Sequence, residues 1–244
     1  MSKYYNEQNF LAEDKLVRFW HSSIIPNDCL KKNLEIGIKM IKTVFLSIHP
    51  TDPQLRLLNQ AVCIIREGGV IVYPTDSGYA LGCQLEEREA VERIRNIRSL
   101  SKEHLFTLIC HDLSQLSRYA HVDNINFRII KSYIPGPYTF ILNASKEVPK
   151  RLLHPKRKTI GLRIPNNKIL LNLLKLFHSP LMSVSLILED DDIHFDEKNG
   201  FQKLRGQVDL IIEGGALKNE PTTILDLTGK TPQLIRLGQG KIDL

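Results

Sequence analysis

The chain has 244 residues, of which 42% are hydrophobic and 25% are charged, values that are ordinary for a globular protein. They exclude a wholly disordered chain and a fibrous, collagen-like design, and the length allows one or two domains. The formal net charge of +6 favours anionic partners such as nucleotides or RNA, but it carries no information about the fold.

The sequence predicts neither a membrane span nor a metal site of a familiar kind. The most apolar stretch, residues 169–177, is far shorter than the roughly 18 residues that a span needs, and Asn172 and Lys175 interrupt it. The N-terminal residues lack the apolar core of a secretory signal, the four cysteines form no CxxC pair, and the histidines form no HExxH motif. We therefore expect a reduced, cytoplasmic protein without a protein-bound metal.

The first 44 residues differ from the rest of the chain. They contain Phe19 and Trp20 but no sustained periodicity, and the strand-like alternation of residues 34–40 is weakened by Gly37. We expect residues 1–44 to form an N-terminal appendage and residues 45–244 to form the folded domain. Met40 is an alternative start, and docking of a partner is one hypothesis for the appendage.

From Phe45 onward, helical and strand-like patterns alternate. Leu55, Leu58, Val62 and Ile65 recur at three- and four-residue spacing, which predicts an amphipathic helix. Further helices are expected at residues 86–98, 112–119, 124–133 and 168–178. Strands are expected at residues 70–73, 105–110, 138–142, 159–164, 181–188, 208–212, 223–227 and 233–236. This alternation predicts an α/β domain with a mixed sheet, a turn at residues 74–78 and an acidic surface loop at residues 190–200.

Hydroxyls and glycines gather after the first of these strands. In residues 73–82, Thr75 and Ser77 are placed to donate hydrogen bonds to an anionic or amino-acid substrate, and Gly78 and Gly82 allow a ligand to approach the backbone closely. Ligands of open α/β sheets bind at the carboxyl ends of strands. An ordinary strand-to-loop turn is the alternative interpretation.

Later strands carry polar residues of their own. Arg163 stands in an apolar strand, where a lone buried cation costs several kcal/mol, so it must be paired or face a cleft. Ser183 and Ser185 have the same parity on a strand and therefore face one side. Thr223 and Arg236, at the ends of the last strands, are weaker binding candidates.

Residues 146–158 form a basic stretch. Its candidate nucleic-acid-binding residues are Lys150, Arg151, Lys156, Arg157 and Lys158. Such a density of cations suits contacts with phosphate groups, and a solvated loop is the alternative.

The order of these segments resembles the YrdC/YciO family. The resemblance rests on the segments YPTDSGYALGC, IRNIRSLSKEHLFTLIC, PGPYTFIL, KRKTIGLRIP, LMSVSL, PTTILDLTG and IRLG, which are collinear from about Ser47 to Gly240. The phrases YPTDSGYALGC, FTLIC, RKTIGLR and QVDLII are similar to the YciO branch. The resemblance implies a YrdC-like open twisted mixed sheet with flanking helices and a concave basic face.

The resemblance also implies an activity. YrdC members are nucleotidyltransferases, L-threonylcarbamoyladenylate synthases, which convert threonine, bicarbonate and ATP to threonylcarbamoyl-adenylate and release pyrophosphate. The product serves the threonylcarbamoyladenosine modification of tRNA, and family members are described as binding double-stranded RNA or tRNA. ATP with Mg²⁺, threonine, bicarbonate and RNA are therefore the expected partners.

Carried over residue by residue, Thr75 matches the motif that lines the threonine pocket, and Arg163 matches the strand arginine close to the ligand. Ser183 and Ser185 match the serine-rich strand near the nucleotide, whereas Thr223 and Arg236 match positions that frame the site. Arg98 keeps, as arginine, the first charge of a Lys-x-Arg motif, so Arg98 and Arg163 are the expected catalytic cations.

Three departures from the synthase branch put the activity in doubt. Arg98-Ser99-Leu100 lacks the second charge of Lys-x-Arg, Ser185-Leu186-Ile187 lacks the asparagine of Ser-x-Asn, and Asn167-Lys168 replaces a His-Pro pair. A double-stranded RNA- or tRNA-binding protein of the YciO type, with weak or no synthase activity, is therefore the alternative to a synthase.

Overall fold

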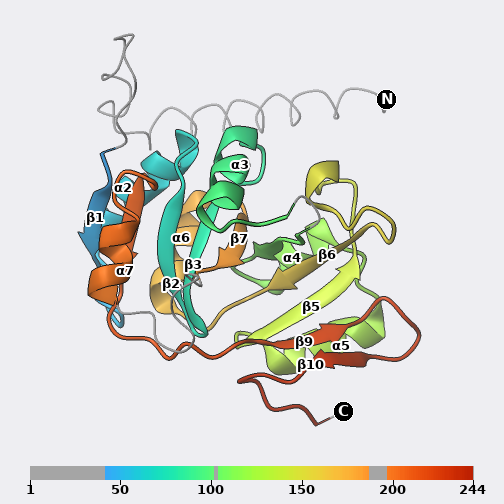
Figure 1. The fold of residues 1–244 in the computed structure, drawn as a ribbon. Helices are drawn as coiled ribbons and strands as arrows, with labels where there is room; N and C mark the ends of the chain where they lie inside the picture. Colours follow the sequence, from blue (N-terminus) through green and yellow to red (C-terminus); the bar gives the residue numbers. More distant parts are fainter. Residues whose placement is uncertain (1–41, 102–103, 187–196, 244) are drawn as a thin grey trace, which may run out of the picture. The chain divides into compact units, whose positions relative to one another are not determined.

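The computed structural model describes residues 42–101, 104–186 and 197–243. Its strands form one sheet of ten strands in the order β1-β8-β2-β3-β7-β4-β6-β5-β9-β10 (Figure 1). The strands are β1 (Val44–Ser47), β2 (Ile71–Thr75), β3 (Gly78–Gln84), β4 (Thr107–Ile109), β5 (Tyr138–Asn143), β6 (Thr159–Arg163), β7 (Leu181–Ser185), β8 (Leu210–Glu213), β9 (Thr223–Asp226) and β10 (Gln233–Arg236).

The helices connect these strands and flank the sheet. They are α2 (Leu55–Arg66), α3 (Arg88–Ile97), α4 (Leu113–Tyr119), α5 (Asn124–Tyr133), α6 (Lys168–Phe177) and α7 (Glu197–Lys203), with a short 3₁₀ turn, η2 (Lys150–Leu152). Parallel pairs such as β1 with β8 and antiparallel pairs such as β2 with β3 occur together. The expected α/β fold with an open mixed sheet and flanking helices is thereby confirmed, whereas the concave basic face stays a prediction.

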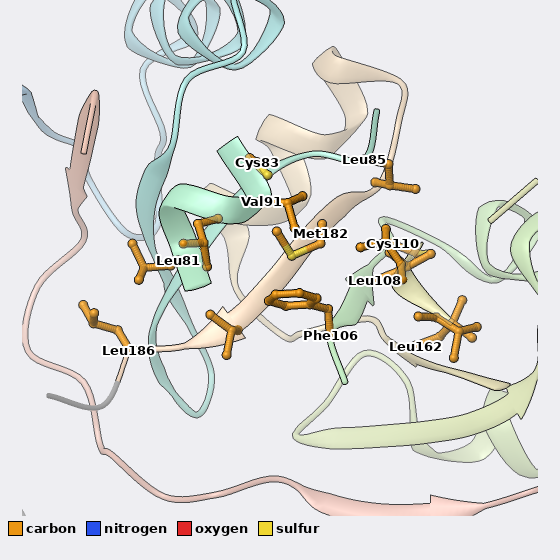
Figure 2. Packing of buried hydrophobic residues seen from close by; sticks show 14 of the residues in the cluster. Leu81, Cys83, Leu85, Val91, Phe106, Leu108, Cys110, Leu162, Met182 and Leu186 are labelled. Atoms are coloured by element: carbon orange, nitrogen blue, oxygen red, sulfur yellow. The ribbon is translucent and has the colours of Figure 1, made fainter. Parts of the chain in front are cut away.

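Each face of the sheet has its own apolar core. On one face, α2 and α6 bury residues such as Leu58 and Leu173 against Ile71 and Leu181 of the strands. On the other face, α3, α4, α5 and α7 pack against the alternate strand residues, and Figure 2 shows Val91 of α3 in this core together with Met182 and Phe106. Because successive strand residues point to opposite faces, central strands such as β2 and β7 contribute to both cores.

The apolar core under α2 and α6 extends over only part of this face of the sheet, and most of the polar side chains that continue the face are themselves buried. This core reaches Leu181 of β7 and Ile109 of β4 but, within the described part of the chain, includes no residue of β5, β6 or β9. The side chains that continue this face beyond the core are largely polar. We call them the polar face: Thr107, Thr139, Arg163, Ser183, Thr222 and Asp226.

Most helices begin where the local sequence supplies a cap. The carboxylates of Asp112 and Asp123 accept hydrogen bonds from the backbone at Gln115 and Asn126, and Asn167 does the same for α6. Side chains of this kind satisfy N–H groups that the first helical turn leaves unpaired.

Four expectations about local structure need correction or comment. Residues 78–84, for which no strand was expected, form the strand β3, and residues 44–47 form the edge strand β1. Helix α7 begins at Glu197, inside the range expected to be a loop. The appendage predicted at residues 1–44 lies, up to residue 41, outside the described residues.

Candidate active site

The strand register places five of the predicted site residues on one face. In the sheet, Ser183 of β7 pairs with Gly82 of β3, and Gly82 pairs with Ile71 of β2. Thr75 is four residues after Ile71 on the same strand, so its side chain is on the same face as that of Ser183. On the other side of β7, the register continues from Ser183 through Thr107 to Gly161, which has the parity of Arg163. Ser185 has the parity of Ser183, and the pairing of β5, β9 and β10 carries the same face to Arg236.

Arg163 is held by an ion pair with Asp76. Both side chains are nearly inaccessible, with exposed fractions of 7% and 11%, and the second oxygen of Asp76 accepts a hydrogen bond from the backbone of Asn166 at 2.7 Å. Burial lowers the pKa of the Arg163 guanidinium, and the Asp76 carboxylate opposes that shift. The buried Nε of Arg163 has no hydrogen-bond partner among the described residues.

The hydroxyl of Thr75 is occupied by the turn in which it lies. Its Oγ1 donates to the carbonyl oxygen of Gly78 at 2.6 Å and accepts from the backbone N–H of Ser77 at 3.1 Å. The side-chain oxygens of Thr75 and Ser77 are 3.3 Å apart. Thr75 therefore closes the β2–β3 turn, and Ser77 is the more accessible of the two hydroxyls.

A buried tyrosine holds the Ser183 side chain by a hydrogen bond. The Tyr73 hydroxyl donates to Ser183 Oγ at 2.6 Å, and burial raises the pKa of this phenol far above its ordinary value. Gly82 makes room for the ring, because a Cβ at position 82 would lie 2.8 Å from Tyr73 Cε1. With its oxygen accepting from Tyr73, the Ser183 hydroxyl has its own proton available for an acceptor on the polar face.

Arg98 lies beside the last residue of β7. It is the residue that ends α3, and its Nε donates to the carbonyl oxygen of Ser185 at 2.9 Å. Since Ser185 itself is exposed, Arg98 and Ser185 form the rim of the polar face at this strand end.

A second group of polar side chains lies at the other end of the polar face. Arg236 donates to the carbonyl oxygen of Thr222 from Nε at 3.0 Å and from Nη2 at 2.9 Å. The hydroxyls of Thr222 and Thr139 are 3.0 Å apart. Thr223, the predicted residue, lies on the opposite face, fully buried, where its Oγ1 donates to Gly240 and accepts from the backbone of Gly238.

The polar face also contains a second ion pair. Arg157 contacts Asp226 at 3.0 Å, and Thr228 donates two hydrogen bonds to the same carboxylate. Burial alone would raise the pKa of Asp226, but the bonds from Thr228 and the Arg157 cation together lower it below its ordinary value. Each of these two arginines of the face is thus neutralised by one carboxylate.

The basic stretch has mixed environments. Arg151 donates to the carbonyl oxygen of Leu85, and Lys158 donates to the carbonyl oxygen of Pro155 at 2.9 Å. Lys150 and Lys156 are exposed, and neither side chain has an ion-pair partner in the described part of the chain. These two lysines are therefore the members of the stretch best placed for an external anion.

Sequence reasoning missed three residues that define the site: Asp76, Tyr73 and Thr222. The requirement that a buried arginine must pair pointed to a carboxylate, and Asp76 stands inside the segment already singled out. Nothing in the local pattern distinguishes Thr222 from Thr223, because the register alone decides which of two neighbours faces the site.

Guanidinium groups and hydroxyls dominate this face. Fixed donors of this kind bind anions and stabilise negative charge that develops during group transfer. In residues 42–243, outside the gaps, no group of three or more His, Cys, Asp or Glu side chains is placed to hold a metal ion. In the same residues, no helix combines the length and apolarity that crossing a membrane requires.

Comparison with known proteins connects this geometry to a family. The Sua5–YciO–YrdC family profile, described as "Telomere recombination", matches residues 63–238. The chain belongs to this family. The resemblance seen in the sequence segments is thereby confirmed.

Two branches of the family are represented among the relatives. YciO of Escherichia coli (strain K12), described as uncharacterized, is 54% identical over 81% of this chain and 97% of its own length. The crystal structure of E. coli YciO has a TM-score of 0.78 and covers 82% of this chain and 97% of its own. The threonylcarbamoyl-AMP synthase of Bos taurus is 29% identical over 77% of this chain and 63% of its own length.

A structure that contains a bound amino acid is also similar. The crystal structure of P. abyssi Sua5 complexed with L-threonine is 25% identical, has a TM-score of 0.73, and covers 80% of this chain and 58% of that chain. The family's sheet is therefore shared between proteins that differ considerably in sequence.

Proposed function

We propose that the protein is a threonylcarbamoyl-AMP synthase-like nucleotidyltransferase that acts on threonine, bicarbonate and ATP in the cytoplasm. The observation that carries the proposal is the alignment of Arg163, Ser183, Ser185 and Arg236 on one face of the sheet, with Arg98 at its rim. Support comes from the relationship to threonylcarbamoyl-AMP synthases and from the similarity to a Sua5 that binds L-threonine.

The chemistry that this face would serve is adenylyl transfer. The amine of threonine forms an N–C bond with the carbon of bicarbonate, and a C–O bond breaks so that water leaves and a carbamate remains. A carbamate oxygen then attacks the α-phosphorus of ATP. A new O–P bond forms while the bond from the α-phosphorus to the pyrophosphate oxygen breaks, and pyrophosphate leaves with the electron pair. Catalysis of this kind depends on positioning and on cations near the developing charge.

The residues divide these tasks. Arg98, Arg163 and Arg236 are the cations in our proposal. Ser183, whose oxygen accepts a hydrogen bond from Tyr73, uses its own O–H to donate a hydrogen bond to a ligand oxygen. Arg163 is fixed by Asp76, so it needs no reorganisation when a ligand arrives. Ser77 and the turn closed by Thr75 border the amino-acid end of the site.

Mg²⁺ enters our proposal as part of the ATP substrate, since hard cations are usually bound through substrate phosphates and few carboxylates. The described carboxylates of the site, Asp76 and Asp226, each contact an arginine. They would therefore have to leave those partners before either could ligate the ion.

The departures from the synthase motifs predict a weak enzyme. Each lost charge-assisted contact is worth roughly 1–3 kcal/mol, so the altered motifs lower the rate by orders of magnitude relative to a full synthase. Ile187, which stands in place of the asparagine of Ser-x-Asn, lies outside the described residues. We therefore expect the protein to catalyse the synthase reaction, but more slowly than a full synthase.

The decisive measurement is pyrophosphate release from ATP that requires both threonine and bicarbonate. We expect Arg98→Ala and Arg236→Ala to lower this release by about 10- to 100-fold, which corresponds to a loss of about 1.4–2.7 kcal/mol. Arg128→Ala is the matched control, because Arg128 is an exposed cation on α5. A folded protein whose release ignores threonine and bicarbonate contradicts the proposal.

A second candidate function is binding of double-stranded RNA or tRNA with little or no synthase activity. The exposed cations Lys150 and Lys156 favour it, because neither has an ion-pair partner among the described side chains. Arg151, Arg157 and Lys158 of the same stretch would add further phosphate contacts.

The test for this candidate is the salt dependence of affinity for an RNA duplex. Neutralising a phosphate contributes about 0.9 to the slope of log affinity against log salt for a duplex. Lys156→Ala is expected to reduce the slope by about one such unit and to leave pyrophosphate release unchanged. Affinity that does not respond to salt argues against RNA binding.

A further inference from the structure

A hollow with a volume of about 690 Å³ lies away from the polar face. It is lined by Arg88 and Glu92 of α3 and by Pro149, Lys150 and Arg151 at η2. Helix α3 and the segment that contains η2 both contribute to the apolar core on the face of the sheet opposite to α2 and α6. The hollow is therefore separate from the candidate active site in location.

The charge in the hollow is not balanced by its own walls. Three cations, Arg88, Lys150 and Arg151, line it against one carboxylate, Glu92. Glu92 forms an ion pair with Arg95 of the same helix, in which Glu92 Oε1 lies 3.6 Å from Arg95 Nε. Among the residues that the structure describes, neither Arg88 nor Lys150 has an ion-pair partner.

The backbone around the hollow is fixed on both sides. Arg151 donates to the carbonyl oxygen of Leu85, and Leu152, the next residue of η2, is buried in the core. Arg88 is the first residue of α3, whose N-cap residue Glu87 makes no side-chain capping bond. The partial positive charge of this helix end adds to that of the three cations.

The chemistry of the lining selects the ligand. Apart from Pro149, the residues that line the hollow have charged side chains, whose aliphatic parts also contribute to its walls. Arginines form paired hydrogen bonds with phosphate oxygens, and a lysine adds a mobile point charge. A phosphate group carries enough charge and enough acceptor oxygens to engage all three cations together.

We propose that the hollow formed by Arg88, Lys150 and Arg151 is a phosphate-binding site outside the active site. Its ligand is either a phosphodiester of an RNA strand or a free phosphate compound such as pyrophosphate, and both present the same chemistry. The proposal does not depend on synthase activity, because none of the residues assigned to adenylyl transfer lines the hollow.

The test compares the full-length protein with the double variant Arg88→Gln/Lys150→Gln. Its matched control is Arg56→Gln/Lys175→Gln, which removes the same two charge types from exposed positions of α2 and α6 on the opposite face. Two probes are used: inorganic pyrophosphate by calorimetry, and a short RNA duplex by fluorescence anisotropy between about 50 and 200 mM salt. Circular dichroism establishes that all three proteins are folded.

We expect the hollow variant to bind at least one probe about tenfold or more weakly than wild type, while the control variant keeps wild-type affinity. If the hollow binds RNA, the salt slope for the duplex falls by about 1–2 and pyrophosphate binding is unaffected. If the hollow binds free phosphate compounds, the affinity of the hollow variant for pyrophosphate falls too. Equal binding by wild type and the hollow variant, or equal losses in the hollow and control variants, overturns the proposal.

Discussion

The Asp76–Arg163 pair gives the sharpest test of how the site is built. In the variant Asp76→Ala, the guanidinium of Arg163 stays in a nearly inaccessible position without its carboxylate. A buried charge without compensation is far more costly than a missing contact, since the ion keeps its desolvation penalty and loses its Coulombic partner. The variant therefore isolates the cost of an unpaired, nearly inaccessible arginine in the polar face.

The magnitude follows from the burial of the pair. Exposed fractions of 7% for Arg163 and 11% for Asp76 leave both charges nearly inaccessible to water, and removal of one partner of such a pair costs about 3–5 kcal/mol. The backbone N–H of Asn166 also loses its acceptor. For a domain of this size, such a loss lowers the melting temperature by about 6–20 °C.

The assay is urea denaturation of wild type, Asp76→Ala, Arg163→Met and the double variant. The double variant removes both charges, so we expect it to be more stable than Asp76→Ala, with a coupling of at least about 2 kcal/mol. Glu220→Ala, at an exposed position, is the control and should change the free energy of unfolding by less than about 0.5 kcal/mol. An Asp76→Ala cost below about 1 kcal/mol, or strictly additive single effects, refutes the reasoning.

Three further predictions concern packing, acid sensitivity and thiol reactivity. Gly82→Ala brings a Cβ to 2.7 Å from the Met182 carbonyl oxygen and 2.8 Å from Tyr73, so it should cost about 1–3 kcal/mol in urea denaturation, whereas Gly229→Ala meets nothing closer than 3.6 Å and should be tolerated. Asp226 has a lowered pKa in the folded state, so its contribution to stability is complete above the ordinary value of about 3.9 and is lost as the pH falls through the folded pKa. The stability difference between wild type and Asp226→Asn should thus stay constant above about pH 5 and shrink as the pH falls below about 4, and a difference that stays constant down to about pH 2 would contradict the assignment. Burial raises the pKa of Cys83 to about 12, so iodoacetamide at about pH 8 should label this thiol only after unfolding, as peptide mass spectrometry can establish.

Periodicity was a good guide to the helices and to most strands. The apolar spacing of Leu55, Leu58, Val62 and Ile65 predicted a helix that the structure places at Leu55–Arg66, with the three later positions of the stripe buried. The cause is local. A helix that packs on a sheet must carry its apolar residues on one side, and this requirement fixes the three- and four-residue spacing that can be recognised in the sequence.

The strand β3 shows where local reasoning fails. Pro74 and Gly78 predicted a turn at residues 74–78 with no strand directly after it, yet residues 78–84 pair with both β2 and β7. Gly82 is needed because the Tyr73 ring occupies the space beside it, and Pro74 is tolerated because β2 pairs with β8 only at residues 71 and 72. Both reasons concern neighbouring strands, and no property of residues 74–84 alone reveals them.

The candidate site divides in the same way. The sequence by itself determined that Arg163 needs a partner or a cleft and that Ser183 and Ser185 share a side, because burial costs and strand parity are local rules. The tertiary structure alone decided that the partner is Asp76 and that Thr222, rather than Thr223, faces the site. Pairing across a sheet fixes the face of every residue at once, and that register depends on strands that are far apart in the chain.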